Sequence, residues 1–454
     1  MATQPSDERL RKLSEAELER FKERTPRSLE LARRAVEVLP NAVASGVSVL
    51  NPYPLAVREG AGAHVWDIDG NAYSDYSLGF GALPFGHAHP RIAAVIRERA
   101  ATGTHFGAVT EDAVRWAELI RRRFALDWVR FTSSGTEATM DALRLARART
   151  GRELIAKIEG GYHGTHPDAL ISGSVGIGAG AGPDHAPTAR PVGRGVADAV
   201  RQGIAPLPFN DLEAAERVLS TEAIACVLLE PIMFNVGAIF PEPGYLEGLR
   251  ELCDRTGTLL VFDEVKTGIT VAFGGARELF GVEPDLICLG KGIGGGIGAG
   301  AIGGRDPWGY ELIESWAVPQ LSTFAANPLA AGAGAAALEL LDRDAYRRLE
   351  EHRAQLNAGL TDAIERWELP AYVIGAAAKN CVVWVEGPEL RDYRDYERRF
   401  SSRLGWLAWL WLVNRGVLLS PGRDEQTTHS IAHTGEDAAR FGEAFAELGA
   451  ALRA

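Results

Sequence analysis

The feature that most constrains this fold is an alternation of apolar strands and helices between about residues 90 and 341. Helical patterns, such as those at 137–150 and 243–256, stand between short apolar runs. Most of these runs are apolar throughout, which is typical of parallel strands covered on both faces. The pattern predicts an α/β fold with a doubly wound, mostly parallel sheet. The candidate strands are WVRFT (128–132), ELIAKI (153–158), IACVLLE (224–230), TLLVFDE (258–264) and DLICLG (285–290).

The chain on either side of this region has a different pattern. Residues up to about Val38 are charged and helical, with a capping box predicted at Ser14 and Glu17. Residues 51–77 alternate short apolar runs with Gly and Asp, which predicts a small antiparallel sheet. From about residue 342 onward, helical patterns mix with the short runs CVVWVEG and GVLLS. This last part predicts a smaller α+β unit.

Composition and charge exclude several classes of protein. The 454 residues are too many for one compact core, and 46% hydrophobic residues argue against wholesale disorder. A net charge of −12 gives no electrostatic footprint for nucleic acid. The most apolar helical run, Leu404 to Val413, has about half the length of a membrane span and predicts a buried helix. Four widely spaced cysteines without a C-x-x-C pair favour a reducing compartment, so we expect a cytoplasmic protein without a metal site.

Polar residues at the ends of the predicted strands are the candidates for chemistry, because open α/β sheets bind ligands beyond their carboxyl ends. After WVRFT, residues 133–138 (SSGTEA) begin a helix whose hydroxyls and amides suit a phosphate, although an ordinary Ser helix cap would look the same. After ELIAKI, Tyr162 stands among glycines, where its ring can lie flat against a planar ligand. Glu230 and Asn235 follow the next strand.

Asp263 and Lys291 end two further strands. A carboxylate that ends a buried strand is costly without a cation, so Asp263 taken alone favours a structural ion pair. Lys291 precedes a glycine-rich loop, where desolvation favours the neutral, nucleophilic amine; a lysine that reaches from the sheet edge to water is the alternative. Together, a lysine, a carboxylate, an aromatic ring and a phosphate cup predict pyridoxal 5'-phosphate as the cofactor.

On these residues the chain resembles the class III pyridoxal-phosphate-dependent aminotransferases of fold type I, and most of all the branch that holds glutamate-1-semialdehyde aminomutase. The resemblance runs from about Leu39 to His433. The 28-residue interval between Asp263 and Lys291 also matches the family. The motifs that carry it stand in the family's order: FTSSGTEATMDALRLARARTGR, EGGYHG, LLVFDEVKTGI, LICLGKGIGGG and STFAANPLAAGAG.

The resemblance implies an enzyme that moves amino groups between small molecules by a ping-pong Schiff-base mechanism. Lys291 would form the Schiff base, and Asp263 would face the pyridinium nitrogen. Val265 and Tyr162 would pack on opposite faces of the ring. Thr323 would reach the phosphate from the second subunit of a homodimer. The other implied cofactor contacts are Ser134, Gly135, Thr136, His163, Glu230 and Asn235.

The resemblance also implies a division into domains. An N-terminal arm with part of the small domain would comprise residues 1–77, the large cofactor-binding domain residues 78–341, and the C-terminal small domain residues 342–454. Residues 172–206 are rich in Gly, Ala and Pro and resemble a gating loop of the aminomutase, so we expect a mobile lid near the active site. A slack insertion far from any site is the alternative.

The resemblance leaves two reactions open, an aminotransferase and an aminomutase, which differ in how the substrate is bound. The aminomutase has an arginine that grips the substrate carboxylate, and Ser48 takes that position here. Glu425 matches a glutamate of the aminomutase, and Arg423 could supply a replacement carboxylate contact. The missing arginine favours an aminotransferase over an intramolecular aminomutase. A non-catalytic cofactor-binding protein is a further alternative.

Overall fold

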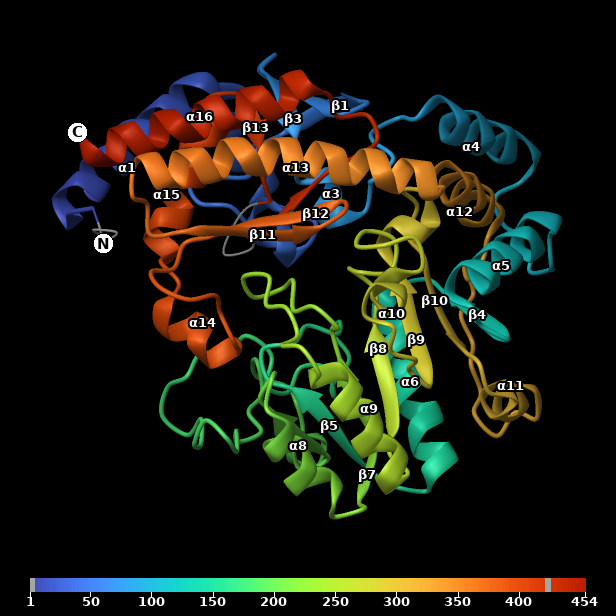
Figure 1. The fold of residues 1–454 in the computed structure, drawn as a ribbon. Helices are drawn as coiled ribbons and strands as arrows, with labels where there is room; N and C mark the ends of the chain where they lie inside the picture. Colours follow the sequence, from blue (N-terminus) through green and yellow to red (C-terminus); the bar gives the residue numbers. More distant parts are fainter. Residues whose placement is uncertain (1–4, 421–425) are drawn as a thin grey trace. The chain divides into compact units, whose positions relative to one another are not determined.

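The chain divides into two compact units in the computed structural model, which describes residues 5–420 and 426–454 (Figure 1). The larger unit comprises Pro90–Arg343 and Leu390–Arg398, and the smaller unit comprises the remaining described residues. The division expected from the sequence had boundaries at 77 and 341 and placed residues 390–398 in the small domain. The difference arises because side chains of this segment hydrogen-bond to Glu159, Asp184 and Asn210 of the larger unit.

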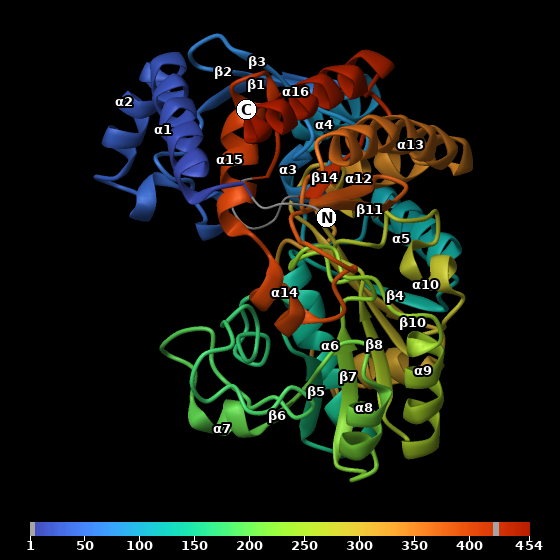
Figure 2. The same ribbon diagram turned by 60° about the vertical axis from the view of Figure 1, so that its left-hand side comes forward.

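The larger unit is built on a seven-stranded sheet in the order β4-β10-β9-β8-β7-β5-β6. β10 runs antiparallel to both of its neighbours, whereas the pairs from β9 to β6 are parallel. Helices α8 and α9 lie on one side of this sheet and α6 on the other (Figures 1 and 2). The predicted doubly wound, mostly parallel sheet is therefore confirmed. Its strands are β4 (Trp128–Thr132), β5 (Leu154–Ile158), β6 (Ile204–Leu207), β7 (Ile224–Leu229), β8 (Leu259–Asp263), β9 (Leu286–Gly290) and β10 (Gly300–Gly304).

Its helices connect and cover these strands. Gly residues end several of them in the left-handed conformation, as Gly151 (φ 68°) does after α6. The helices are α4 (Pro90–Thr102), α5 (Glu111–Phe124), α6 (Gly135–Thr150), α7 (Asp198–Gln202), α8 (Leu212–Leu219), α9 (Tyr245–Thr256), α10 (Gly275–Phe280), η3 (Lys291–Gly294), α11 (Pro307–Glu314), α12 (Pro328–Leu340) and α14 (Tyr393–Arg399).

Two strands of the sheet, β6 and β10, have no apolar run that predicts them. β10 has the sequence GAIGG, and its glycines are required by their neighbours: a Cβ at Gly300 would lie 2.2 Å from the Ser134 carbonyl oxygen. β6 is short and contains Pro206. Helix α7 and β6 also occupy the end of the segment predicted as one loop over residues 172–206, so the irregular part is shorter than expected.

The smaller unit contains two small sheets and the helices around them. One sheet has the order β1-β2-β3-β13 and the other β11-β12-β14. The β1-β2-β3 part confirms the antiparallel sheet predicted for residues 51–77. The elements are α1 (Asp7–Arg24), α2 (Pro26–Ala35), η1 (Pro40–Ala42), η2 (Gly46–Ser48), β1 (Val57–Ala61), β2 (His64–Asp67), β3 (Ala72–Asp75), α3 (Leu78–Gly81), α13 (Arg343–Arg366), β11 (Tyr372–Ala376), β12 (Lys379–Val383), α15 (Ser402–Val413), β13 (Val417–Leu418), β14 (Gln426–Thr428) and α16 (Gly435–Arg453).

The start of the first helix differs from the prediction. Helix α1 begins at Asp7, and the Ser6 hydroxyl accepts a hydrogen bond from the Arg9 amide at 3.2 Å. Ser14 and Glu17, predicted as a capping box, lie inside this helix, and Glu17 is buried. The prediction was wrong because a Ser-x-x-Glu spacing also occurs within a helix, where it has no capping role.

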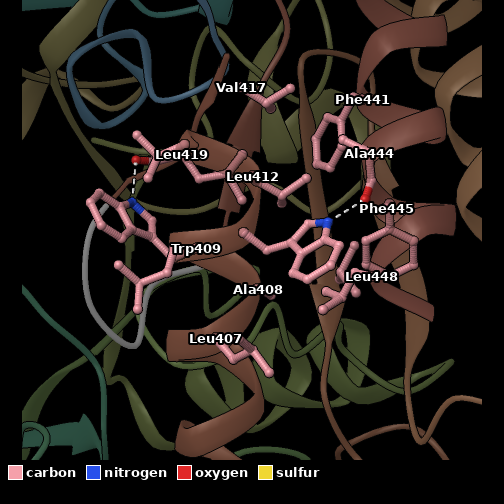
Figure 3. Packing of buried hydrophobic residues seen from close by; sticks show 14 of the residues in the cluster. Leu407, Ala408, Trp409, Leu412, Val417, Leu419, Phe441, Ala444, Phe445 and Leu448 are labelled. Atoms are coloured by element: carbon pink, nitrogen blue, oxygen red, sulfur yellow. Dashed lines mark hydrogen bonds between the residues drawn. The ribbon is translucent and has the colours of Figure 1, made fainter. Parts of the chain in front are cut away.

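The apolar run at Leu404–Val413 forms most of α15 in the core of the smaller unit (Figure 3). The Trp409 indole donates to the Leu419 carbonyl at 3.1 Å, and the Trp411 indole donates to the Ala444 carbonyl at 2.9 Å. Both polar tips are therefore satisfied within the apolar cluster. Among the residues that the structure describes, no helix is both long and apolar enough to cross a membrane.

Candidate active site

The register of the central sheet brings the candidate residues to one edge. Gly300, the first residue of β10, pairs with Thr132 at the end of β4 and with Gly290 at the end of β9. The residues that follow these two ends are Ser133 and Lys291. Asp263 ends the neighbouring strand β8. The Gly290 position has no room for a side chain, because a Cβ there would lie 3.1 Å from Val265 and 3.4 Å from the Gly135 Cα.

The residues predicted as a phosphate cup lie at the N-terminus of α6. Ser134 caps this helix, and its hydroxyl accepts the Glu137 amide at 3.2 Å. The first amides of a helix, here those of Gly135 and Thr136, have no acceptor within the helix and can bind an anion. Ser134, Gly135 and Thr136 are all half-buried.

A further hydroxyl, which the sequence did not single out, lies beside these residues. The Ser322 hydroxyl lies 2.8 Å from the Ser133 hydroxyl and donates to the Glu137 carboxylate at 2.8 Å. The Glu137 carboxylate also accepts the Ser133 amide at 2.8 Å. Residue 322 is far from residue 133 in sequence, so only its place before the predicted Thr323 could have pointed to it.

Asp263 is held in place by two hydrogen bonds. Its Oδ2 lies 2.7 Å from His163 Nδ1, and its Oδ1 accepts the Val265 amide at 3.0 Å. Both the His163 and the Asp263 side chains are almost completely buried. The alternative of a structural ion pair therefore has a partner in His163, and the same contact fixes the orientation of the carboxylate.

The turn that carries Tyr162 is held by a second buried carboxylate. Glu230 Oε1 accepts the Tyr162 amide at 3.0 Å, and Glu230 Oε2 accepts the Asn235 side-chain amide at 2.7 Å. Burial raises the pKa of Glu230, and these two donors oppose that rise. The backbone of Tyr162 is fixed while its ring stays 45% exposed. The ring is thus free to cover a planar ligand.

Lys291 begins η3 in an unusual backbone conformation. Its φ is +50°, which is uncommon for a residue other than glycine and is found at functional sites. The following Gly292, Ile293 and Gly294 are buried, whereas Lys291 is half-buried. The turn therefore places the lysine at the surface of the sheet edge and not in its core.

A buried lysine that the sequence did not single out lies below the Tyr162 turn. Lys157 on β5 is 1% exposed, and its ammonium donates to the carbonyls of Gly161 (2.8 Å) and Ser172 (3.2 Å). Desolvation lowers the pKa of Lys157 to about 7, opposed by the charges of Glu230 and Glu159. Nothing in the run ELIAKI distinguishes this residue from a lysine at a solvent-facing strand position.

The expected substrate residues do not belong to the described part of the larger unit. Ser48 ends η2 in the smaller unit and is half-buried. Arg423 and Glu425 lie outside the residues that the structure describes. Thr323 is exposed on the larger unit, next to Ser322. These four assignments stay predictions.

The residues at the sheet edge fit pyridoxal phosphate. The glycines at 135 and 290 leave a space that side chains would fill, since a Cβ at Gly135 would lie 2.7 Å from Val265 Cγ2. The fixed carboxylate of Asp263 suits a protonated ring nitrogen, and the α6 N-terminus suits the phosphate. Among the described residues, no group of three or more His, Cys, Asp and Glu side chains could hold a metal ion.

Comparisons with known proteins agree with this geometry. Residues 45–377 match the family model for class-III aminotransferases. The chain is 41% identical over 414 residues to a glutamate-1-semialdehyde 2,1-aminomutase of Methanothermobacter thermautotrophicus, covering 90% of this chain and 96% of the relative. It is 32% identical to an omega-transaminase of Sphaerobacter thermophilus, with a TM-score of 0.88 and coverage of 94% and 98%.

A third comparison bears on the cofactor. A variant of a glutamate-1-semialdehyde aminomutase from Pseudomonas aeruginosa PAO1, solved in complex with PMP, is 30% identical, with a TM-score of 0.90 and coverage of 99% of this chain and 100% of the other. Pyridoxal phosphate is accordingly the cofactor of this chain, in a subunit of fold type I. The chain belongs to the class-III aminotransferase family.

Proposed function

We propose that the chain is an enzyme that moves amino groups, with Lys291 as the residue that binds the cofactor and transfers the proton. The observation that carries the proposal is the placement of Lys291 and Asp263 after adjacent strands, with Asp263 fixed by His163 at 2.7 Å. When bound, pyridoxal phosphate withdraws electrons from the substrate carbon that loses its proton.

The chain's own residues supply the remaining chemistry. Asp263 keeps a proton on the ring nitrogen, which makes the electron withdrawal strong. Lys291 would hold the cofactor, and its Nζ amine would be the base that takes up the substrate proton and the acid that gives it back. Ser134, Gly135 and Thr136 bind the phosphate, and Tyr162 and Val265 hold the ring between them.

The names of the relatives support an intramolecular amino shift on glutamate 1-semialdehyde more strongly than the intermolecular transfer favoured by the sequence. We therefore propose the shift as the first reaction to test. Purified holoenzyme is incubated with glutamate 1-semialdehyde alone, and 5-aminolevulinate is measured. Steady formation without any second substrate supports the shift, with Lys291→Ala as the control that abolishes it. No formation, with an active donor and acceptor pair instead, contradicts it.

One observation favours the transaminase as a second candidate. Ser48 stands where the aminomutase pattern has an arginine, and a serine cannot grip a carboxylate through two parallel hydrogen bonds. In that case a panel of amino donors should convert the cofactor to its aminated form, seen as a change in the visible spectrum. Ser48→Arg should then increase amino-shift activity. A protein whose spectrum responds to no donor and to no semialdehyde would be the non-catalytic alternative.

We further propose that the enzyme is a homodimer in which Thr323 serves the partner's site. Two apolar side chains close to Thr323 in sequence are exposed on the larger unit, namely Leu321 (76%) and Phe324 (61%), and Trp316 of the same unit is 65% exposed. Val109 is 82% exposed in the same unit. Exposed apolar patches mark interaction sites, and a second copy of this chain is the occupant that the Thr323 assignment requires.

Light scattering tests the dimer. Phe324→Asp should shift the molar mass to that of one chain, because the interface would have to bury the new charge. Leu279→Asp is the matched control, since Leu279 is 41% exposed elsewhere on this unit and should leave the mass unchanged. A wild-type protein of one-chain mass would contradict the proposal.

The cysteines support the proposed cytoplasmic location. All four cysteines are buried, and Cys226, Cys253 and Cys288 are free thiols. Burial raises the pKa of Cys253 to about 12, which disfavours its reactive thiolate form. Free, buried thiols fit a reducing compartment.

A further inference from the structure

Arg394 on α14 is a buried cation with no place in the predicted site. Its side chain is 4% exposed. A guanidinium has five N–H donors, and here they make five hydrogen bonds to two separate segments. Two go to the Glu159 carboxylate, at 2.6 and 3.1 Å. Three go to the loop at 181–184: the carbonyls of Ala181 (2.6 Å) and Gly182 (2.8 Å), and the Asp184 carboxylate (3.1 Å).

The first of these segments is the turn that leads to Tyr162. The Glu159 side chain is 2% exposed, so its charge depends on Arg394 for compensation. The next residue, Gly160, adopts φ +84° and packs against the ring of Tyr393, with only 2.4 Å from an added Cβ to the Tyr393 Cγ. The following carbonyl, that of Gly161, accepts the Lys157 ammonium. Consecutive residues of α14 thus fix consecutive residues of the turn.

The second segment is the irregular loop after Ser172. The Tyr393 hydroxyl accepts the Gly176 amide at 2.6 Å, and Arg394 binds the same loop at 181–184. The loop closes on itself where the Thr188 amide donates to the Ala181 carbonyl at 2.9 Å. Figures 1 and 2 show α14 beside this loop in both views. Two consecutive residues of one short helix, Tyr393 and Arg394, therefore bind both the loop and the Tyr162 turn.

We propose that Arg394 is a positioning residue that couples the order of loop residues 173–190 to the turn that carries Tyr162. The inference rests on the proposed function in one respect, because it takes the Tyr162 ring to cover the cofactor. The single planar guanidinium of Arg394 joins both segments. When the loop moves, the contact that compensates the Glu159 charge changes, and so does the position of the turn. The loop then affects amino transfer without touching the substrate.

Three variants separate the parts of this arrangement. Arg394→Met removes the guanidinium, and with it the hydrogen-bond donors and the positive charge. Arg394→Lys keeps a charge for Glu159 but cannot reproduce the planar guanidinium, so the loop contacts are lost. Arg398→Met is the matched control, because Arg398 lies on the same helix and binds Asp184 at 2.6 and 2.9 Å but does not contact Glu159. Circular dichroism and thermal unfolding establish that each variant folds.

Hydrogen exchange on the full chain, with and without pyridoxal phosphate, gives a readout independent of activity. Arg394→Met should speed the exchange of the Gly160, Gly176 and Thr188 amides by about tenfold or more, because their partners lose a common anchor. Arg394→Lys should release the Gly176 and Thr188 amides more than the Gly160 amide. Arg398→Met should leave all three within about twofold of wild type. Unchanged exchange in folded Arg394→Met would overturn the proposal, and if that variant does not fold, unchanged exchange in Arg394→Lys would do so.

Kinetics of the holoenzyme test the coupling to Tyr162. Arg394→Met should keep the visible band of the lysine-bound cofactor, while kcat falls by about tenfold, as a misplaced contact outside the chemistry can cause. Arg394→Lys should recover part of kcat. Equal kcat in wild type and Arg394→Met would contradict the coupling. If wild-type protein shows no cofactor band, the proposed function fails instead, and the exchange experiment still decides whether the loop and the turn are coupled.

Discussion

The two units each contain a buried polar centre, and the centres differ in how their groups are compensated. In the larger unit, two buried carboxylates have nitrogen partners: Glu159 binds Arg394, and Asp263 binds His163. In the smaller unit, the rings of His352, His429 and His433 surround Tyr76, whose ring centroid lies 4.3 Å from that of His433.

The compensation in the smaller unit is incomplete within the described residues. Neither ring nitrogen of His429 has a hydrogen-bond partner there. Burial lowers the pKa of His352 and His429, and lowers that of His433 to about 3, so these rings are neutral. The difference teaches that the three histidines of the smaller unit pack as neutral rings, whereas Asp263 and Glu159 of the larger unit each have a buried nitrogen partner. Removal of a charged side chain from the proposed active site of the larger unit should therefore reduce activity. Protonation of the histidine rings should reduce the stability of the smaller unit.

The largest expected effect is on Lys291. Lys291→Ala should lower kcat by a factor on the order of 10⁴, because in the proposed function the residue both binds the cofactor and transfers the proton. The unfolding midpoint should hardly change. His429→Leu in the smaller unit should instead change the unfolding midpoint and leave kcat within about threefold of wild type. Turnover and thermal unfolding of both variants check the contrast, and comparable kcat losses in the two would remove the distinction between the centres.

The next effect separates two adjacent carboxylates. Asp263→Asn should lower kcat by about 10² to 10³-fold, since an amide cannot keep the ring nitrogen protonated. Glu264 is also buried, but its oxygens accept the Ala276 amide (2.7 Å) and the Arg277 amide (3.0 Å) at the start of α10. Glu264→Gln should therefore reduce stability and leave kcat per folded, cofactor-loaded subunit nearly unchanged. A larger kcat loss in Glu264→Gln than in Asp263→Asn would reverse the assignment.

Acid should destabilise the smaller unit through its histidines. Their folded pKa values lie below the unfolded value of about 6.5, so their neutral form stabilises the fold above that pH and the benefit is lost as the pH falls below it. At pH 5 each buried ring would cost up to about 2 kcal/mol.

The groups that face the cluster come from several elements, and urea unfolding at pH 7.5 and pH 5.0 measures their net effect. Asp437 and His64 face His433, whereas Arg353 and Lys379 face His429 and further disfavour its protonation. His429→Leu should flatten the pH dependence by the share of one ring. An equally steep loss of stability in that variant would mean that other groups control the acid response.

Much of the central sheet could be predicted from the sequence, for a physical reason. Strands covered on both faces are apolar throughout, so β4, β5, β7, β8 and β9 stand out as continuous runs. β10 could not be recognised this way, because its glycines are imposed by the close approach of the Ser134 carbonyl and of neighbouring strands. That requirement exists only once the sheet has formed.

The site was predictable where its residues follow strand ends. Asp263, Lys291 and Glu230 could be named because each interrupts an apolar run at the edge where ligands bind. Arg394 and Lys157 could not. The partners of Arg394 lie more than 200 residues away in sequence, and the partners of Lys157 are backbone carbonyls that leave no trace in the residue pattern.

Borohydride reduction followed by peptide mapping tests the central claim most directly. The holoenzyme is reduced, digested and examined by mass spectrometry for the mass of the reduced cofactor. The label is expected on the peptide that contains Lys291 and on no peptide that contains Lys157 or Lys266. A label on another lysine, or an unlabelled protein that still turns over amines, would contradict the account.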